Sequence, residues 1–412
     1  MRKLLQKILK IFAKIVLAKY KPIIIAITGS VGKTSAKEAI YAVLKSHFGE
    51  KRIRKNERNY NNEIGVPLTI FKMETGNRSI FKWLFKFIKI FWMIIFRIKY
   101  PDFLILEMGA DRPGDLLYLL RFVKHKVGVV TAIGDIPVHV EFFQTPEKVA
   151  EEKKTIVKTL DKDGIAILNY DDEKVRKMNE DISAKIMTFG FNEKADVRAT
   201  NCNLEINSNG SELNFKLDFK GSSIPAKLHN VIGTQHLYSA LAAAAVGIVF
   251  NLNLVEISEA IKTIQPLLGR MHLIKGVKNT LIIDDTYNAA LLSMEAGLES
   301  LKVFENRRKV VVLGDMLEIG QYSEKAHILV GKKAAEIADI IFAVGNRAGF
   351  IKQGAISTGF DANKIFEFST SNEAAKPVEK EMKESDVVFV KGSRAMKMEK
   401  IVEEIIYHAV IV

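Results

Sequence analysis

A glycine-rich turn near the N-terminus carries the residues with the clearest chemistry. It follows the apolar run of residues 23–27, which is typical of a strand buried on both faces, and it leads into a segment with helical spacing of apolar residues. The N–H groups at a helix N-terminus bind anions, and glycine lets a phosphate approach closely. The pattern therefore predicts a phosphate-binding loop made of Gly29, Ser30, Val31, Gly32, Lys33, Thr34 and Ser35.

Two side chains of this loop have expected roles in nucleotide binding. Lys33 would reach the β- and γ-phosphates, and Thr34 would hold Mg²⁺. The spacing G-x-x-G-K-T is shorter than the common G-x-x-x-x-G-K-[ST], so a chance match is the alternative. We favour the functional interpretation because an expected strand and an expected helix flank the motif as it requires.

Further polar side chains follow the ends of expected strands. Glu107 ends one apolar strand, and His139 lies shortly after the next. In an open α/β sheet, ligands bind beyond the carboxyl ends of the strands, so both residues are candidates for a site that holds a metal-bound phosphate. Asn59, Asn61 and Asn62 lie in a loop, where their amides can either bond a ligand or cap a turn.

The order of the expected elements predicts the fold class α/β. We expect a P-loop nucleotide-binding central domain, with a mostly parallel sheet and a small antiparallel part at 196–228, and then a Rossmann-like α/β C-terminal domain. The predicted strands are 23–28, 102–107, 127–131, 164–169, 281–284, 309–313, 339–344 and 386–390. The expected divisions are a basic amphipathic helix at 1–20, the nucleotide-binding central domain at 21–268 and the C-terminal domain at 269–412, with a hinge at 266–270.

Composition narrows the class of protein. The 412 residues are 48% hydrophobic and 26% charged, as in a globular protein. The single cysteine, Cys202, excludes disulfides and cysteine-rich zinc sites and fits a reducing compartment. The formal net charge of +13 suits nucleic acid, a membrane or small anionic substrates. Because the sequence has no internal repeat and no RNA-binding signature, we expect no nucleic-acid partner.

Two segments combine lysines with large apolar residues. In residues 1–20 the lysines recur inside the apolar run, which argues against a signal peptide. In residues 80–100 the longest uncharged run is too short to span a bilayer. The charges of this second segment fall on one helical stripe formed by Lys82, Lys86, Lys89 and Arg97. Each segment is either a helix packed within its own domain or a basic helix lying on a membrane surface.

A set of motifs follows in a fixed order along the chain. The motifs are Thr28-Gly29-Ser30-Val31-Gly32-Lys33-Thr34, Asn59-Tyr60-Asn61-Asn62, Glu107-Met108-Gly109, His139 with Glu141, Lys153, Leu168-Asn169 with Asp171-Asp172, Gly269-Arg270, Asp284-Asp285-Thr286-Tyr287-Asn288, Leu313-Gly314-Asp315-Met316-Leu317-Glu318, His327 and Lys391-Gly392-Ser393-Arg394. This ordered set resembles the Mur ligase family, which builds cell-wall peptides. Within the family it is most similar to the MurF type, which adds D-alanyl-D-alanine.

The resemblance implies an ATP-dependent amide ligase of cell-wall precursor synthesis. In that family a substrate carboxylate attacks the γ-phosphate of ATP to give an acyl phosphate, and an amine then displaces phosphate. Catalysis is therefore mostly charge neutralisation and positioning. The implied partners are a cell-wall peptide precursor and an amino acid or dipeptide. We expect a monomeric cytoplasmic enzyme, located at the inner face of the membrane if the basic segments bind lipid.

The resemblance also carries roles over to individual residues. Lys33, His139 and Lys153 are the implied catalytic residues, and Lys153, with Lys154 beside it, matches a lysine that is carbamylated in the family. One Mg²⁺ would be held by Thr34 and Glu107, and a second by His139. The implied ATP contacts beyond the loop are Ser239, Arg270, Asp285 and Asn288. The implied substrate contacts are Asn59, Asn61, Asn62, Lys391, Ser393 and Arg394.

The sequence departs from the family pattern at three places. About twenty residues precede the first strand, so we expect no domain for uridine diphosphate there. The acceptor is then either a UDP-linked precursor bound in another way, or a lipid-linked or other precursor recognised at a membrane surface. Ser239 replaces the family's adenine-side asparagine, and segment 289–294 lacks an amide near the incoming amine. The alternatives are a ligase like folylpolyglutamate synthase, a pseudomurein peptide ligase and a non-catalytic ATP-binding scaffold at the membrane.

Overall fold

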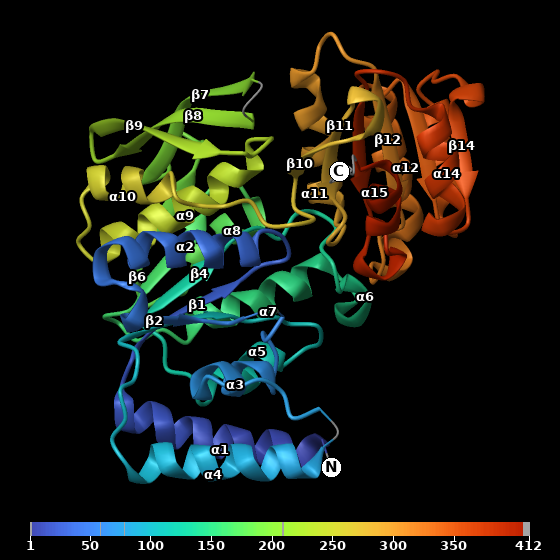
Figure 1. Cartoon of the computed structure of the whole chain (residues 1–412). Coiled ribbons are helices and arrows are strands. Elements are labelled where there is room, and N and C mark those ends of the chain that lie inside the picture. Colours follow the sequence, from blue (N-terminus) through green and yellow to red (C-terminus); the bar gives the residue numbers. More distant parts are fainter. Residues whose placement is uncertain (1, 58, 78, 208–209, 407–412) are drawn as a thin grey trace, which may run out of the picture.

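Two β-sheets, each covered by helices on both faces, make up the chain (Figure 1). The structure is a computed structural model that describes residues 2–57, 59–77, 79–207 and 210–406. The first sheet contains β1 (Ile23–Thr28), β2 (Ile53–Lys55), β3 (Phe103–Glu107), β4 (Val127–Val130), β5 (Ile165–Asn169), β6 (Lys185–Gly190), β7 (Val197–Asn207), β8 (Gly210–Phe219) and β9 (Ser222–His229). Their order across the sheet is β2-β3-β1-β4-β5-β6-β7-β8-β9. The strands from β2 to β7 in this order are parallel, and β8 and β9 continue the sheet antiparallel.

The helices around the first sheet form two layers. They are α1 (Arg2–Tyr20), α2 (Lys33–Phe48), α3 (Gly65–Phe71), α4 (Ile80–Ile95), α5 (Asp115–Leu120), α7 (Pro146–Lys158), α8 (Glu173–Arg176), α9 (Gln235–Val249) and α10 (Leu254–Ile261). The short helix α6 (Val140–Phe143) packs instead with the core of the second sheet. Alternate residues of a strand point to opposite faces of its sheet. Accordingly, Ile25 and Ile27 of β1 pack with α2, α9 and α10, whereas Ile24 and Ala26 pack with α1, α3, α4, α5 and α7. This double burial explains why β1 reads as an uninterrupted apolar run.

The second sheet repeats this architecture on a smaller scale. Its strands are β10 (His272–Lys275), β11 (Leu281–Asp285), β12 (Lys309–Gly314), β13 (Ile340–Val344), β14 (Ile365–Phe368) and β15 (Val387–Lys391), in the order β10-β11-β15-β12-β13-β14. All neighbours are parallel except β10 and β11. The helices are α11 (Leu291–Glu299), α12 (Ser323–Ala335), α13 (Ala348–Ile356), α14 (Ser371–Glu381) and α15 (Glu399–Ile405). The first three pack on one face and the last two on the other, as in a Rossmann-like α/β unit.

The predicted fold class is confirmed, and the predicted strands are present within one or two residues of their expected ends. The antiparallel excursion is also confirmed, by β7, β8 and β9. One detail of the second basic segment was wrong. The helix ends at Ile95 and Phe96 is extended, so Arg97 lies beyond the helical stripe that holds the lysines. The chain passes from the first sheet to the second after α10, and we propose residue 269 as the boundary between two domains.

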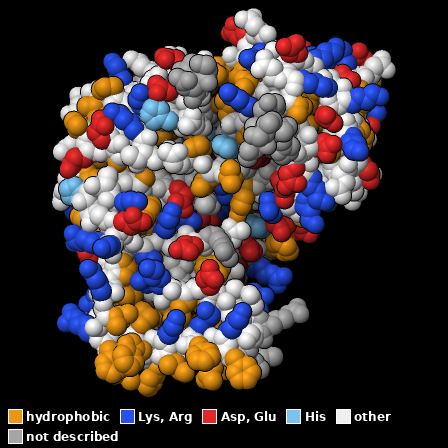
Figure 2. All heavy atoms as spheres, in the orientation of Figure 1, with side chains coloured by type: hydrophobic (Ala, Val, Ile, Leu, Met, Phe, Trp, Pro, Cys, Tyr) orange, Lys and Arg blue, Asp and Glu red, His pale blue; other side chains and the backbone are white. Residues whose placement is uncertain are grey.

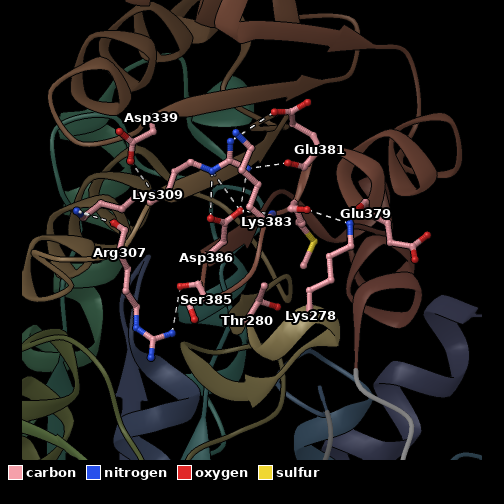
Figure 3. Close-up of polar contacts among 12 residues, drawn as sticks. Lys278, Thr280, Arg307, Lys309, Asp339, Glu379, Glu381, Lys383, Ser385 and Asp386 are labelled. Atoms are coloured by element: carbon pink, nitrogen blue, oxygen red, sulfur yellow. Dashed lines mark hydrogen bonds and ion pairs between the residues drawn. The ribbon is translucent and has the colours of Figure 1, made fainter.

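A polar network holds the second sheet together at the amino ends of its strands, away from the candidate site (Figure 3). The buried carboxylate of Asp386 accepts hydrogen bonds from Arg308 Nε at 3.1 Å and Nη2 at 2.8 Å, and from the backbone N–H of Lys383 at 2.7 Å. Arg308 Nη2 also donates to the carbonyl of Glu381 at 2.6 Å. The network therefore ties the start of β12 to the end of α14 and the start of β15.

We expect Asp386→Ala to lower the free energy of unfolding by about 3 kcal/mol, because it leaves a half-buried guanidinium without its main acceptor. Urea unfolding followed by circular dichroism measures the change. The matched control is Glu384→Ala, which removes an exposed carboxylate two residues away and should change stability by less than about 0.5 kcal/mol. Equal stability of Asp386→Ala and the wild type would contradict the structural role of this network.

Candidate active site

A cavity of about 460 Å³ lies where the carboxyl ends of strands from the two sheets face each other. Residues that are far apart in the sequence line it together. Of the residues singled out from the sequence, those in the lining are Ser30, Val31, Gly32, Lys33, Thr34, Ser35, Asn59, Asn61, Glu107, His139, Lys153, Ser239, Arg270, Asp285, Asn288 and Lys391. The cavity therefore brings together candidate phosphate, metal and substrate contacts from nine separate segments of the chain.

The phosphate loop connects β1 to α2, and its shape depends on glycine. Gly29 has a φ of 148°, and a Cβ there would lie 2.0 Å from Thr131 Oγ1. The backbone N–H groups of Ser30 and Val31 both donate to the carbonyl of Ala132, at 2.7 and 3.1 Å. These two amides therefore do not point at a phosphate, contrary to the expectation that the whole loop presents its N–H groups. The first turn of α2 retains its helix N-terminus, where Lys33 is the first helical residue.

The amine of Lys33 folds back over the loop. Its Nζ donates to the carbonyls of Gly29 at 2.7 Å and Ser30 at 3.3 Å. Burial lowers the pKa of Lys33, and the carboxylate of Glu107 opposes this shift. A phosphate oxygen is a stronger acceptor for this amine than a carbonyl, because it carries charge.

Glu107 is held at the end of β3 by asparagine side chains. The backbone N–H of Glu107 donates to Asn56 Oδ1 at 2.5 Å, and Asn56 Nδ2 donates to the backbone carbonyl of Glu107 at 3.3 Å. Asn61 Nδ2 donates to Glu107 Oε1 at 3.2 Å, and Lys37 Nζ lies 3.6 Å from Oε2. The carboxylate is thus oriented from several sides at the edge of the phosphate loop, since β3 is the parallel neighbour of β1.

His139 brings a buried ring nitrogen without a hydrogen bond to the cavity. His139 sits in a left-handed turn with φ of 67°, and its Nδ1 is buried without a hydrogen bond, although Glu318 Oε2 lies 2.9 Å away in an unfavourable direction. Burial, together with the nearby charges of Lys33 and Lys153, lowers the pKa of His139 to about 4. The imidazole is therefore neutral near pH 7 and can donate a lone pair.

Lys153 projects from α7 and is 1% exposed. Within the described part of the chain its amine has no hydrogen-bond or ion-pair partner. Burial and the charge of Lys33 lower its pKa to about 7. An unpaired buried ammonium ion is strongly unfavourable, so a large fraction of this amine is neutral at physiological pH.

The second sheet contributes an arginine that reaches back to the loop. Arg270 Nη2 donates to Thr34 Oγ1 at 3.1 Å, and its guanidinium lies 4.1 Å from the centre of the Tyr287 ring. Gly269, with φ of 69°, allows the turn that brings Arg270 there, and its carbonyl accepts from Tyr287 N–H at 3.0 Å. The Tyr287 hydroxyl bonds to Asn59 across the cavity. These contacts join the two sheets directly at the phosphate loop.

Asp285 and Lys391 form a buried ion pair on adjacent strands. They are register partners on β11 and β15, and Lys391 Nζ lies 2.6 Å from Asp285 Oδ2. The amine also donates to the carbonyl of Asn288 at 2.8 Å. Lys391 therefore orients the Asp285 carboxylate and fixes the start of the loop that leads to α11.

The far end of the cavity is lined by α9 and the turn after β5. Ser239 is buried there, and the neighbouring Tyr238 hydroxyl donates to Asp171 Oδ2 at 3.0 Å. His236 Nε2 is buried without a partner, and burial followed by the charge of Arg270 lowers its pKa to about 4. The side chains that line this wall are polar, with the ring of Tyr238 among them.

Four residues from the sequence interpretation do not line this cavity. Gly29 contributes its backbone conformation to the phosphate loop, close to Thr131. Asn62 Oδ1 caps the start of α3 by accepting from Gly65 N–H at 2.9 Å. Ser393 Oγ accepts from Leu317 N–H at 2.9 Å, which places it in the packing of the second sheet. Arg394 is exposed and pairs with Glu399 at 3.4 Å. For Asn62 the capping interpretation, which the sequence left open, describes the observed contact.

Three residues at the site had no role assigned from the sequence: Asp111, and also Tyr287 and Glu318, which belong to motifs quoted above. Asp111 lines the cavity, and its Oδ1 lies 3.4 Å from His139 Nε2. Tyr287 supports Arg270, and Glu318 approaches His139 from the second sheet. Asp111 lies four residues after Glu107, just beyond the end of a predicted strand, and this position was the signal in the sequence that could have identified it. Its direction, however, depends on a loop whose course no local pattern predicts.

A second cavity of about 460 Å³ adjoins the first and shares Asn61, Gly109 and Asp111 with it. Its other walls come from the start of α1, the loop before α3, the loop before α5 and α5 itself. They include Arg2, Lys3, Gln6, Asn62, Glu63, Arg112 and Asp115. Charges of both signs line this groove, which leads from the candidate active site to the first turn of α1.

Comparisons with known proteins agree over nearly the whole chain. Residues 27–247 match the Mur ligase middle domain, and residues 269–394 match the Mur ligase, glutamate ligase domain. The chain is 30% identical over 383 residues to the UDP-N-acetylmuramoyl-tripeptide–D-alanyl-D-alanine ligase of Escherichia coli, covering 92% of this chain and 76% of that protein. It is 27% identical to the ligase of the same name from Bacillus subtilis, over 93% of this chain and 76% of that protein.

A solved structure supports the same relationship. The crystal structure of MurF from Acinetobacter baumannii superimposes with a TM-score of 0.80 at 26% identity, covering 97% of this chain and 80% of that chain. The match of a family description to more than half of the residues and the agreement of the whole fold lead to one conclusion. The chain belongs to the Mur ligase family.

Proposed function

We propose that the protein is an ATP-dependent ligase that joins a carboxylate of a cell-wall peptide precursor to the amine of D-alanyl-D-alanine. The observation that carries this proposal is the single cavity in which the phosphate loop, Glu107, His139 and Lys153 face Arg270 and the Asp285–Lys391 pair. The names of the bacterial relatives support the choice of substrates. We propose the cytoplasm as the compartment, because ATP is the co-substrate.

The chain's own residues would bind ATP from both sheets. Lys33 and the first turn of α2 would hold the β- and γ-phosphates. Arg270 would add a cation from the second sheet, and the wall around Ser239 would take the adenine. The contact between Arg270 and Thr34 bridges the two sheets at the phosphate loop. We therefore expect nucleotide binding to be coupled to closure of the cavity.

The donor set fits Mg²⁺. Thr34 and Glu107 offer a hydroxyl and a carboxylate at the phosphate loop, and the unpartnered Nδ1 of His139 offers a further lone pair. Within the described residues no three His, Cys, Asp or Glu side chains form a complete metal site, which suits an ion that takes most of its ligands from phosphate and water. Bound there, Mg²⁺ would neutralise phosphate charge and align the phosphate for attack.

The proposed reaction has two steps. A carboxylate oxygen of the acceptor attacks the γ-phosphorus of ATP, the bond to ADP breaks, and an acyl phosphate forms. The amine nitrogen then attacks the acyl carbon, the carbon–oxygen bond to phosphate breaks, and the nitrogen loses a proton. Lys33 and Arg270 would stabilise the charge that accumulates on phosphate oxygens, and the closed cavity would exclude water from the acyl phosphate.

The groove next to the cavity supports a route for the acceptor peptide. It meets the active-site cavity at Asn61 and Asp111, close to the end of β3. Its mixed charges suit a peptide that carries both carboxylates and an amine. We propose that the acceptor lies in this groove with its reacting carboxylate directed toward the phosphate loop.

The alternatives are less well supported. The curated relatives described above are D-alanyl-D-alanine-adding ligases rather than folate or pseudomurein enzymes. A non-catalytic scaffold would not need Lys33, Glu107 and Lys153 in one cavity.

We expect phosphate release from ATP to require both a tripeptide precursor and D-alanyl-D-alanine, with one ligated peptide detected by mass spectrometry for each phosphate released. The acceptors to be compared are the UDP-linked precursor, its lipid-linked form and the free peptide. Lys33→Ala should lower kcat by at least about a thousandfold, because it removes the cation at the reacting phosphate. The control Lys51→Ala removes an exposed lysine outside the cavity and should keep full activity. Absence of stimulation by every acceptor would refute the ligase assignment.

We also propose that Lys153 is carbamylated. A neutral lysine amine attacks the carbon of CO₂, a nitrogen–carbon bond forms, and the nitrogen loses one proton to leave an anionic carbamate. The burial of Lys153, its lack of a partner and its pKa of about 7 support this modification. The carbamate would place anionic oxygens beside His139 and relieve the cost of an unpaired buried cation.

The pH dependence gives a test. At a fixed partial pressure of CO₂, we expect kcat to rise as the pH passes upward through about 7, because protonation below that pH blocks the attack on CO₂. Removal of CO₂ should lower kcat, and bicarbonate should restore it. Lys153→Arg should lower kcat at least about a hundredfold and abolish the response to CO₂, whereas Lys154→Arg should retain both. A wild-type enzyme indifferent to CO₂, without the mass of one CO₂ on Lys153 under native conditions, would count against the modification.

A further inference from the structure

Helices α1 and α4 lie side by side and form one end of the molecule (Figure 1). Their inner faces belong to the core below the first sheet, where Leu9 and Val16 of α1 and Ile90 of α4 are fully buried. Their C-terminal ends are fastened together, because Lys19 Nζ donates to the carbonyls of Met93, Ile94 and Phe96 at 3.0, 2.9 and 2.6 Å. The two helices therefore form a fixed layer, which we call the basal layer.

The outer face of the basal layer is apolar and exposed. The large apolar side chains that it presents are Leu4, Ile11 and Ile15 of α1, and Phe81, Leu84, Phe85, Ile88, Phe91, Trp92, Ile95 and Phe96 at α4. Exposure reaches 77% for Phe81 and 67% for Phe85. Figure 2 shows these hydrophobic side chains gathered over the base of the molecule. A contiguous apolar surface of this kind is rare on soluble monomers and marks an interaction surface.

Positive charge borders this face. On a helical projection the lysines lie along one edge of the exposed apolar stripe in each helix: Lys3, Lys7, Lys10 and Lys14 in α1, and Lys82, Lys86 and Lys89 in α4. Neither helix contains an acidic residue. Figure 2 shows basic side chains just above the hydrophobic base. Long lysine side chains beside an apolar face can reach anionic headgroups while the face enters the acyl region.

The charge pattern identifies the partner. A second copy of the chain would bring two sets of lysines together with no acidic side chain on either helix to balance them. Among the described residues, no helix is long and apolar enough to cross a membrane. We propose that the basal layer docks the protein on the surface of an anionic phospholipid bilayer, with α1 and α4 lying in the plane of the interface.

Docking has a consequence for the substrate, and this consequence rests on the proposed function. The first turn of α1 belongs to the basal layer, and its Arg2, Lys3 and Gln6 also line the groove that adjoins the active-site cavity. Docking would therefore hold the acceptor groove beside the headgroups. That arrangement suits an acceptor carried on a membrane lipid.

Vesicle binding tests the docking surface. The protein is mixed with vesicles of phosphatidylcholine alone, or of phosphatidylcholine with one quarter phosphatidylglycerol, and binding is measured by co-sedimentation. Both tryptophans are in α4, and Trp92 is 57% exposed on the outer face, so docking should shift the intrinsic fluorescence to shorter wavelength. We expect binding to the anionic vesicles, weaker binding to the neutral ones, and weakening by salt.

Variants locate the binding on the basal layer. Phe85→Asp with Ile88→Asp should weaken binding to anionic vesicles at least about tenfold, because both side chains are exposed at the centre of the apolar face. Lys82→Gln with Lys89→Gln should reduce the preference for anionic lipid. The matched control is Val255→Asp with Ile356→Asp, which places the same charges at exposed apolar positions elsewhere and should bind as the wild type does.

Three results would overturn the docking proposal. The first is that the wild type does not bind anionic vesicles. The second is that the control variant loses as much vesicle binding as the variant of the basal layer. The third is that the wild type forms a dimer through this face and does not bind lipid. If the basal variant were unstable, the Trp92 fluorescence shift of the wild type would still decide the outcome. Vesicle binding needs no catalysis, so its failure is separable from failure of the ligase assay.

Substrate kinetics test whether docking presents a lipid-linked acceptor to the groove. The variant Phe85→Asp with Ile88→Asp should have a higher KM than the wild type for a lipid-linked acceptor and the same KM as the wild type for a soluble acceptor. A KM for the lipid-linked acceptor equal to that of the wild type would refute this consequence.

Discussion

The parallel arrangement of strands is the constraint on which the rest of the structure depends. In a parallel sheet all carboxyl ends lie at one edge, so the residues that follow different strands meet there. The phosphate loop after β1, Glu107 at the end of β3 and His139 after β4 are gathered in this way. The second sheet presents the ends of β11 and β15 to the same space. Two such edges facing each other make one cavity from segments spread over more than three hundred residues.

The electrostatics of the cavity follow from what it would bind. Lys33, Lys153 and Arg270 enter it with few carboxylates paired to them, and burial lowers the pKa of both lysines. Such a concentration of buried and partly buried cations is unfavourable unless anions compensate it. A polyphosphate and a carboxylate acceptor supply those anions, and the cations in turn reduce the repulsion between these two reactants. Folding stability and catalysis therefore make opposite demands on the same side chains.

The two ends of the molecule show how one core can support different tasks. The helices below the first sheet bury one side against β1 and β3, which fixes the position of the phosphate loop. Their other side is the exposed basal layer, bordered by lysines. Because α1 contributes to both the basal layer and the acceptor groove, a partner that binds the base also reaches the entrance of the site. By contrast, the network around Asp386 lies at the amino ends of the strands of the second sheet, outside the candidate active site.

The sequence by itself determined the chemistry and the class of fold. The phosphate loop, the apolar strands and the ordered motifs are local patterns. Local patterns predict structure well because they reflect the periodicity of side chains and the geometry of the backbone. The strands that escaped prediction were β2, β6, β10 and β14, which are short or lie partly exposed, so their side chains show little alternation. Only the tertiary structure decided that the Ser30 and Val31 amides pair with Ala132 and that Ser393 supports a loop. It also decided that Asp111 and Tyr287 join the site and that the apolar face of α4 remains uncovered. Each of these depends on a partner distant in sequence, and no local pattern states which distant residue will be close in space.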